Sequence, residues 1–417
     1  MSATPVTSGP SAGQVAAAVR ATYIAFIGAG FVFASWASRI PQIRDQLQLS
    51  SAELGLLLLS IAVGSIIALP MAGSVIHRLG SSRTVAVTSI LVAVSMAVLA
   101  VGYLFGVVPV VVGLFLTGLG YGAWDVAMNV QGAVVERRLG RAIMPRFHAG
   151  FSVGTVAGAL LGVLMVAVDV PVTAHLLVVA VAVGVAVPVA VRRFVSDTGA
   201  DNEEAVAPVD VEQGPRERGG ALTRWREPRT LLIGICVLAF AFAEGVGNDW
   251  ISVALIDGYG VPAVVGTLGF TAFLAAMTVA RWVGPGLLDR YGRVMVIRLL
   301  SAVSVVGLLL FVFSPHVGLA FVGALLWGAG ASLGFPVGMS AAADDPAAAA
   351  GRVSVVASIG YCAVLAGPPL IGFLGESVTV LKALTSVAVL LALAILIAGT
   401  LKPLGPSTTH TTAAGDR

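Results

Sequence analysis

The sequence predicts an all-α integral membrane protein with twelve transmembrane helices in two related bundles of six. Three observations support this prediction. Hydrophobic residues make up 58% of the 417-residue chain and charged residues only 11%, with a mean hydropathy of +0.98. The apolar residues gather in runs of about 20, the length that an α-helix needs to cross the hydrocarbon core of a bilayer. The two halves of the chain also repeat short patterns at a nearly constant separation.

Charges, prolines and glycines mark the ends of the apolar runs and so give the boundaries of the predicted helices. The predicted spans are 20–40, 53–76, 84–105, 108–131, 148–168, 172–191, 230–255, 263–287, 294–314, 317–340, 353–373 and 379–401. Ser50 and Glu53 have the spacing of a capping box, which predicts that a helix begins at this point. The 50 glycines suit membrane helices, where small residues allow backbones to approach closely.

Lysine and arginine are distributed unevenly between the segments that join the spans. If the N-terminus is cytoplasmic, 20 of the 24 lie on the cytoplasmic side and 3 on the other side, while Arg281 lies inside a span. Membrane proteins carry an excess of basic residues in their cytoplasmic segments, so we expect both termini in the cytoplasm. Because these residues recur at the ends of spans and form no basic module, the net charge of +3 predicts no nucleic-acid partner.

Residues 194–229 interrupt the apolar pattern with a charged stretch that contains proline and glycine. Such a stretch has too few large apolar side chains to fold alone. The predicted organisation is a cytoplasmic N-terminal tail (1–19), a six-helix bundle (20–191), a flexible cytoplasmic linker (192–229), a second six-helix bundle (230–402) and a cytoplasmic C-terminal tail (403–417).

Two patterns occur once in each half. GSVIHRLGSSR (73–83) follows the second span and PGLLDRYGRVM (285–295) follows the eighth, which places His77 and Asp289 212 positions apart. GLG at 118–120 matches GAG at 328–330 at a separation of 210. These separations predict duplicated six-helix units. Parallel repeats of this kind place a substrate site between the halves, near the middle of the membrane.

The first pattern resembles the loop signature of the major facilitator superfamily, in which Asp-Arg is followed by one residue, a glycine and a basic residue. The second copy fits the signature well, and the first copy has histidine in place of aspartate. The resemblance implies that both loops act as conformational switches. Their residues are Gly73, His77, Arg78, Gly80 and Arg83 in the first copy and Asp289, Arg290, Gly292 and Arg293 in the second.

Five further motifs resemble the bacterial branch of this superfamily near the rhizopine-uptake and fucose-permease-like proteins. They are WASRIP (36–41), DVAMN (125–129), FHAGFSVG (147–154), EGVGNDW (244–250) and AGPPLIG (366–372). The resemblance implies a transporter of the bacterial cytoplasmic membrane that imports a sugar or an inositol derivative together with protons. It also implies that the first, fourth, seventh and tenth helices line a central cavity. We expect the protein to be a monomer.

Asp125 lies inside the fourth span. It shares one helix face with Asn129 and with Gly118, Gly122 and Gly132, because these residues follow each other at steps of three or four. A charged side chain at the centre of a bilayer costs about 2.5–3.5 kcal/mol on insertion scales, so by default it marks a substrate or proton path. The alternative is an Asp–Asn pair that only locks helix packing.

Glu244 lies inside the seventh span and shares a face with Asn248, whereas Asp249 points about 140° away from Glu244 at 100° per residue. Asp249 is nearer the outer end, where solvation is its alternative role. A carboxyl group whose hydration and neighbours change between two conformations can take up a proton on one side and release it on the other. We therefore expect Asp125, Glu244 or both to couple protons to a solute.

Arg281 lies eight residues before Asp289, which is about 12 Å along a helix. We expect it to pair with an intramembrane acid. The sequence leaves the partner open between Asp125, Glu244 and another group. The alternative is an arginine that extends its charged end to the inner membrane interface.

Four residues near the ends of spans are further candidates for the pathway. His148 starts the fifth span and either relays protons or caps the helix near the headgroups. Trp36 and Trp250 lie near outer ends and form either an interfacial aromatic belt or a stacking wall for a sugar. Arg39 contacts an anionic group or the outer gate, or else anchors the interface.

The sequence contains no metal-ligand spacing and no phosphate-binding Gly-Lys-Ser/Thr loop, so we expect no metal, no cofactor and no ATP-driven step. Proton-coupled import of a small polar solute is the main expectation. Proton-driven efflux of drugs or metabolites stays the alternative in the same class. A membrane sensor or a membrane-embedded enzyme stays the alternative of a different class, although five scattered histidines offer no catalytic set.

Overall fold

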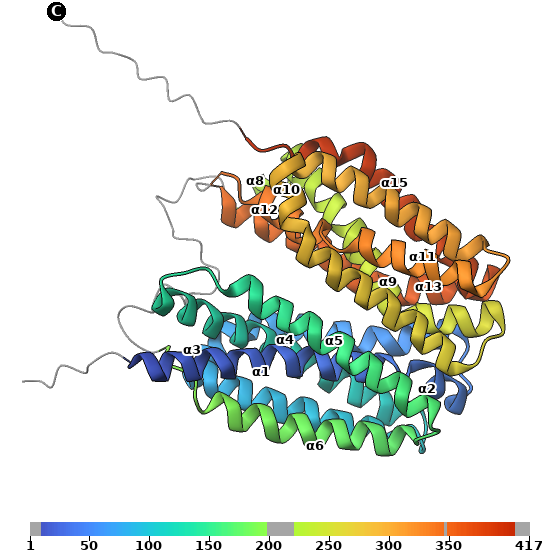
Figure 1. Ribbon diagram of the computed structural model, residues 1–417, viewed down its shortest axis with the longest axis horizontal. Helices are drawn as coiled ribbons and strands as arrows, with labels where there is room; N and C mark the ends of the chain where they lie inside the picture. Colours follow the sequence, from blue (N-terminus) through green and yellow to red (C-terminus); the bar gives the residue numbers. More distant parts are fainter. Residues whose placement is uncertain (1–9, 198–220, 346–347, 405–417) are drawn as a thin grey trace, which may run out of the picture.

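The computed structural model is helical throughout the residues that it describes, which are 10–197, 221–345 and 348–404. Within these residues, ten helices are long and apolar enough to cross a membrane. Figure 1 shows that they form two bundles, one from each half of the chain. The predicted linker at 192–229 and the predicted C-terminal tail at 403–417 lie largely outside the described residues, whereas residues 10–19 of the predicted N-terminal tail are described.

The two halves contain the following elements. The first half consists of α1 (Ala12–Ala37), α2 (Ile40–Leu47), α3 (Ser51–Gly102), α4 (Val107–Leu139), α5 (Met144–Ala167) and α6 (Val172–Val191). The second half consists of α8 (Ala221–Arg224), α9 (Pro228–Tyr259), α10 (Ala263–Phe313), α11 (Val317–Ala331), α12 (Gly334–Ala342), α13 (Ala349–Val378), α14 (Val380–Ala383), α15 (Thr385–Ile397) and the 3-10 helix η1 (Ala398–Leu401).

α3 and α10 are far too long to cross a bilayer once. They have 52 and 51 residues, or about 78 Å each as straight helices, against a hydrocarbon core of about 30 Å. Each contains one glycine with a non-helical backbone, Gly80 at φ 77° and ψ 161° and Gly292 at φ 74° and ψ 162°. This region of backbone space is open almost only to glycine. The chain therefore turns at the same point of the repeat in both halves.

The helices run between two ends of the molecule, which we name by what they hold. The terminal end holds the start of α1, α8 and α12, and lies at the left of Figure 1. The turn at Gly80 lies beside Asp197 after the end of α6, and the turn at Gly292 lies beside Asp344 after the end of α12. The distal end holds α2 and the connection between α9 and α10, and lies at the right of Figure 1. The two bundles come together toward the distal end.

Helix starts follow local capping chemistry. The predicted capping box is confirmed, because Ser50 and Glu53 each accept a backbone N–H bond from the other. A second capping box, which sequence inspection missed, joins Ser11 to Gln14 and starts α1 at Ala12, inside the segment expected to be a tail. Helical structure therefore begins before the first predicted span at residue 20.

The predicted span 317–340 is interrupted in the structure. α11 ends at Ala331 and α12 begins at Gly334. The cause is Pro336, four residues after Ser332. Pro336 has no N–H to donate to the carbonyl group of Ser332, and its ring crowds that carbonyl group. The tenth apolar segment therefore bends near its middle.

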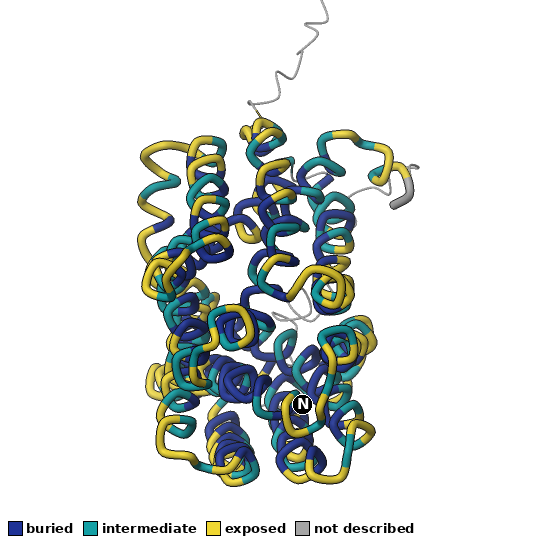
Figure 2. The backbone as a smooth tube through the Cα atoms, turned by 90° about the vertical axis from the view of Figure 1, so that its right-hand side faces the viewer, coloured by how far each residue is buried: buried dark blue, intermediate teal, exposed yellow. Residues whose placement is uncertain are grey.

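Burial follows the pattern expected of a membrane protein. Figure 2 shows buried backbone in the interior of each bundle and exposed backbone around the outside. Many of the exposed side chains are large and apolar, such as Val87 and Val94 on α3 and Leu396 on α15. In water such a surface would promote aggregation, whereas in a membrane it contacts lipid tails.

Polar contacts join the two halves at the distal end. Arg44 of α2 forms an ion pair with Asp257 of α9, and its Nη2 donates to Asp257 Oδ1 at 2.9 Å. Glu376 of α13 accepts a hydrogen bond of 3.1 Å from the backbone N–H of Ala52, in the first turn of α3. Close packing supports these contacts, because a methyl group added to Gly55 would lie 2.5 Å from the carbonyl oxygen of Pro368. We call the Arg44–Asp257 pair the distal latch.

A cluster of charges holds the terminal end of the second half together. Glu227 accepts hydrogen bonds from Arg352 at 2.7 Å and from Thr230 at 2.8 Å, and it forms an ion pair with Arg224. Burial alone would raise the pKa of Glu227, but these hydrogen bonds outweigh it and lower the pKa from 4.5 to about 2. The cluster ties the start of α9 to α13.

This pKa leads to a prediction for stability. A carboxyl group with a lowered pKa in the folded state contributes stability that is complete above its unfolded pKa and is lost as the pH falls toward the folded value. The difference in melting temperature between the wild type and Glu227→Gln should therefore be constant above about pH 5 and shrink between about pH 4.5 and pH 2. Thermal unfolding in detergent measures it, with Asp289→Asn as the exposed control. A difference that stays the same down to pH 3 would contradict the prediction.

Candidate functional site

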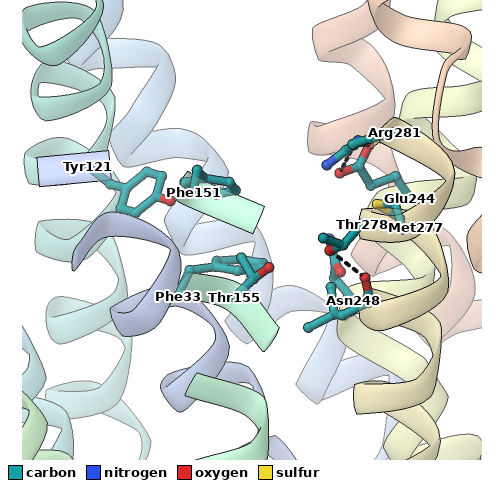
Figure 3. A pocket seen from close by; sticks show the side chains of 10 residues that line it. Phe33, Tyr121, Phe151, Thr155, Glu244, Asn248, Met277, Thr278 and Arg281 are labelled. Atoms are coloured by element: carbon teal, nitrogen blue, oxygen red, sulfur yellow. Dashed lines mark hydrogen bonds and ion pairs between the residues drawn. The ribbon is translucent and has the colours of Figure 1, made fainter. Parts of the chain in front are cut away.

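A cavity of about 170 Å³ lies between the two halves. It is lined by Phe33, Tyr121, Phe151, Thr155, Glu244, Asn248, Leu274, Met277, Thr278 and Arg281. Figure 3 shows that the first four form one wall and that the residues of α9 and α10 form the facing wall. The first half thus contributes mostly aromatic surface, and the second half contributes the charged and amide groups.

An ion pair dominates the wall from the second half. Nη2 of Arg281 donates to both carboxylate oxygens of Glu244, each at 2.8 Å. Both side chains keep 29% of their surface exposed, so the pair is half-buried and in reach of the cavity. Nε of Arg281 donates to the carbonyl oxygen of Ser332 at 3.2 Å. The sequence left the partner of Arg281 open, and in the structure this partner is Glu244.

Asn248 follows Glu244 by one helical turn and lines the same cavity. Its Oδ1 is buried and has no hydrogen-bond partner within the described part of the chain. An unpaired buried acceptor costs about 1–3 kcal/mol. This atom is therefore suited to accept a hydrogen bond from a molecule in the cavity.

The facing wall is built by three helices of the first half. Tyr121 of α4 reaches toward α1 and donates a long hydrogen bond of 3.4 Å to the carbonyl oxygen of Ala29. Phe33 of α1 packs near the Tyr121 ring, at 6.5 Å between centroids. Phe151 and Thr155 of α5 complete the wall one helical turn apart. Aromatic faces of this kind offer apolar contact to one side of a ring-shaped solute.

Asp125 and Asn129 do not line this cavity in the structure. Nδ2 of Asn129 donates to the backbone oxygen of Asp125 at 2.9 Å and to its Oδ1 at 3.3 Å. Both residues are half-buried. Asp125 is close enough to Tyr361 of α13 for an electrostatic interaction across the two halves. The predicted Asp–Asn pair therefore exists within α4.

Asp249 and His148 also lie apart from the cavity lining. Asp249 is half-buried, and its side chain has no hydrogen bond or ion pair to any other described residue. His148 is exposed on α5, with its ring edge-on to Phe26 at 5.2 Å. It interacts electrostatically with Arg281, which lies in the other half. His148 is thus near the charged wall without touching it.

Arg39, Trp36 and Trp250 are all buried in the structure. Arg39 is only 2% exposed and donates to His175 Nδ1 at 2.9 Å and to the carbonyl oxygen of Val170 at 3.1 Å. It therefore ties α1 to α6 and faces neither an anionic group nor the distal latch. Trp36 and Trp250 are 3% and 0% exposed. Buried rings of this kind form neither an interfacial belt nor a stacking wall in this conformation.

The two loops that we expect to act as switches differ in their partners. In the first loop, Asp197 accepts a hydrogen bond of 2.6 Å from the backbone N–H of Ser81, directly after Gly80. In the second loop, Arg293 donates to Asp344 at 2.5 Å. The remaining loop residues, His77, Arg78, Arg83, Asp289 and Arg290, are exposed, with Arg290 over the ring of Tyr291 at 5.2 Å, and Gly73 is half-buried.

Most of the aromatic wall was not predicted from the sequence. Tyr121 lies four residues before Asp125, so the helical spacing that selected Asp125 and Asn129 could have found it. Leu274, Met277 and Thr278 precede Arg281 by seven, four and three residues and share its face in the same way. Nothing in the local sequence distinguishes Phe33 from the other aromatic residues of its span.

Comparison with known proteins decides the family. Residues 21–365 match the family model described as Major Facilitator Superfamily. The chain belongs to the major facilitator superfamily. It is therefore a membrane transporter and not an enzyme, as the loop signatures predicted.

Several relatives of this major facilitator protein cover nearly its whole length. An uncharacterized transporter, y4wD of Sinorhizobium fredii, is 32% identical over 383 residues, which are 90% of this chain and 96% of the relative. The membrane protein MosC of Rhizobium meliloti is 28% identical over 361 residues, or 85% of this chain and 83% of MosC.

Solved structures with the same fold have little sequence in common with this major facilitator protein. The nucleoside transporter NupG superposes with a TM-score of 0.70 at 14% identity, over 92% of this chain and 98% of NupG. A bacterial homologue of the human lysosomal transporter Spinster, in an inward-facing and unoccupied conformation, superposes with a TM-score of 0.71 at 12% identity, over 95% of this chain and all of that chain. These likenesses support the fold alone.

Proposed function

We propose that this protein is a proton-coupled importer of a small polar solute such as a sugar or a polyol. The observation that carries the proposal is the Glu244–Arg281 ion pair, which faces an aromatic wall across the two halves of the molecule. The pair neutralises itself, so the cavity suits a neutral solute. Hydroxyl groups match the charged and amide wall, and the apolar face of a sugar ring matches the aromatic rings.

The proposal includes twelve membrane crossings in two bundles of six, with domain limits near those expected from the sequence. The turns at Gly80 and Gly292 support it, because each divides an apolar helix of more than 50 residues into two crossing segments. The excess of basic residues at the terminal end supports a cytoplasmic position for that end, with both termini inside the cell. We expect a monomer in the bacterial cytoplasmic membrane.

Alternating access then works by rocking of the two bundles around the cavity. With the distal latch formed, the distal end is held closed and the cavity communicates with the cytoplasm. Breaking the latch and joining the terminal ends would open the cavity to the outside.

Glu244 is the acid that we expect to take up the proton, and Asp125 with Asn129 is a second proton position between the halves. Asn248 binds the solute, while His148 lies at the cytoplasmic mouth.

Uptake into proteoliposomes with an imposed pH gradient tests this function. With acid outside, the wild type should accumulate the radiolabelled sugar or polyol that shifts its melting temperature, and a protonophore should abolish the accumulation. Expulsion of solute driven by external acid would instead make the protein an exporter by proton exchange. Uptake that is indifferent to the gradient would remove the proton from the mechanism.

A further inference from the structure

The carbonyl group of Ser332 lies at the bend between α11 and α12, and Ser332 is only 1% exposed. In a continuous helix this carbonyl would accept the N–H of residue 336, but that residue is Pro336, which has none. A buried carbonyl without a donor costs free energy comparable to a lost hydrogen bond.

Arg281 supplies the missing donor. Its Nε binds the Ser332 oxygen at 3.2 Å, while its Nη2 holds both oxygens of Glu244 at 2.8 Å. One planar guanidinium group therefore joins the cavity acid on α9 to the bend of the tenth apolar segment. A lysine at this position would present a single nitrogen and lacks the fork that allows both contacts.

The short helix α12 follows the bend and connects it to the terminal end; we call α12 the lever. α12 runs from Gly334 to Ala342, and Asp344 follows two residues later. Asp344 accepts hydrogen bonds from Arg229 of α9 at 3.0 Å and from Arg293 at 2.5 Å. Arg293 is the residue directly after Gly292, where α10 turns. A shift of α12 about the bend therefore acts directly on the second switch loop.

We infer that Arg281 is a positioning residue that transmits occupancy of Glu244, through the Ser332 carbonyl and the lever α12, to the loop at Gly292–Arg293. This inference rests on the proposed function and adds the route by which the loaded cavity moves the cytoplasmic gate. A proton or a solute hydroxyl that takes the Glu244 oxygens releases Arg281 on that side. Arg281 then settles nearer the bend, and α12 changes its angle. The first half brings two titratable groups toward Arg281: His148 of α5, which interacts with it electrostatically, and Tyr121 of α4, which lines the same cavity.

Pro336→Ala tests the inference because it restores the missing N–H. The new donor competes with Arg281 for the Ser332 oxygen and removes the steric cause of the bend. Pro336 is exposed, so little packing is lost. We expect the turnover number for solute uptake to fall about tenfold, with solute affinity within about twofold of wild type. Pro188→Ala, inside α6 and away from the cavity, is the matched control and should leave both quantities near wild type.

A double-mutant cycle with Arg281→Lys separates transmission from simple damage. Arg281→Lys keeps a cation beside Glu244 and should also lower turnover more than affinity. If both substitutions cut one route, the double variant Arg281→Lys, Pro336→Ala should be no slower than the slower single variant. Losses that multiply would overturn the inference, and so would wild-type turnover in Pro336→Ala.

These results are distinguishable from a failure of the proposed function. If the wild type shows no gradient-driven uptake, the proposed function fails and the cycle has no turnover to compare. If the wild type accumulates solute and Pro336→Ala does so equally fast, the importer stands and the transmission route is wrong. If Pro336→Ala does not fold, the Arg281→Lys ratio of turnover to affinity still decides, because equal loss of both contradicts a positioning role.

Discussion

Replacing Arg281 with glutamine is expected to abolish solute accumulation and to destabilise the folded protein by about 1–3 kcal/mol. The substitution leaves the Glu244 carboxylate half-buried without its cation and leaves the Ser332 carbonyl without its donor. Removing one member of a fully buried ion pair costs about 3–5 kcal/mol. The exposed 29% of both side chains reduces that cost through solvent screening. Thermal unfolding and uptake assays measure the two effects.

The double variant Glu244→Gln, Arg281→Gln is the control for this prediction. Two neutral amides no longer leave an isolated charge in the membrane, so stability should recover most of the loss while accumulation stays absent. Wild-type uptake in Arg281→Gln would show that the ion pair has no part in transport. A double variant that is less stable than Arg281→Gln would show that the charge of Glu244 is tolerated alone.

Reversing the charge at Arg44 is expected to open the distal end. In Arg44→Asp the latch is replaced by two carboxylates, next to a third at Asp45. An ion pair as exposed as this one, with Asp257 at 42%, is worth about 0.2–1 kcal/mol, and repulsion of similar size replaces it. The total of up to about 2 kcal/mol corresponds to a shift of up to about thirtyfold toward the outward-open state.

Labelling of a cavity cysteine from outside measures this shift. In a background with Cys236→Ser and Cys362→Ser, an impermeant thiol reagent should label Thr155→Cys about tenfold faster when Arg44→Asp is also present. The charge-swapped variant Arg44→Asp, Asp257→Arg restores opposite charges and should return labelling to the slow rate. Equal labelling in all three proteins would mean that the latch does not hold the distal end closed.

The distal latch also shows which features of the repeated halves could be predicted from the sequence and which could not. Arg44 and Asp257 are 213 positions apart, close to the 212 that separates Gly80 from Gly292. Equivalent positions of the two halves thus meet each other, as expected of contacts near a two-fold axis. The sequence pattern predicted the repeat and the turns, because glycine at such a turn is a local requirement. It did not predict the latch, because Arg44 and Asp257 are ordinary charges at the ends of helices until the bundles are docked.

The candidate site also contains some residues that could be predicted from the sequence and others that could not. Glu244, Asn248 and Arg281 were predicted because charged and amide groups are costly inside a membrane and stand out in an apolar segment. The choice of Glu244 as the partner of Arg281 depends on how α9 packs against α10, which no local pattern encodes. Phe33 and Phe151 look like any other aromatic residue of a membrane helix. The burial of Trp36 and Trp250 could not be predicted, because distance from a helix end does not reveal which side faces a neighbouring helix.

The most direct test of the account is gradient-driven accumulation by Glu244→Gln. In proteoliposomes with acid outside, the account predicts that this variant still exchanges labelled for unlabelled solute, because the cavity and its aromatic wall remain. Net accumulation above the external concentration should disappear, because the glutamine side chain cannot carry the proton. Accumulation by Glu244→Gln to the wild-type level, with the wild-type dependence on the gradient, would contradict the claim that this acid in the cavity couples protons to the solute.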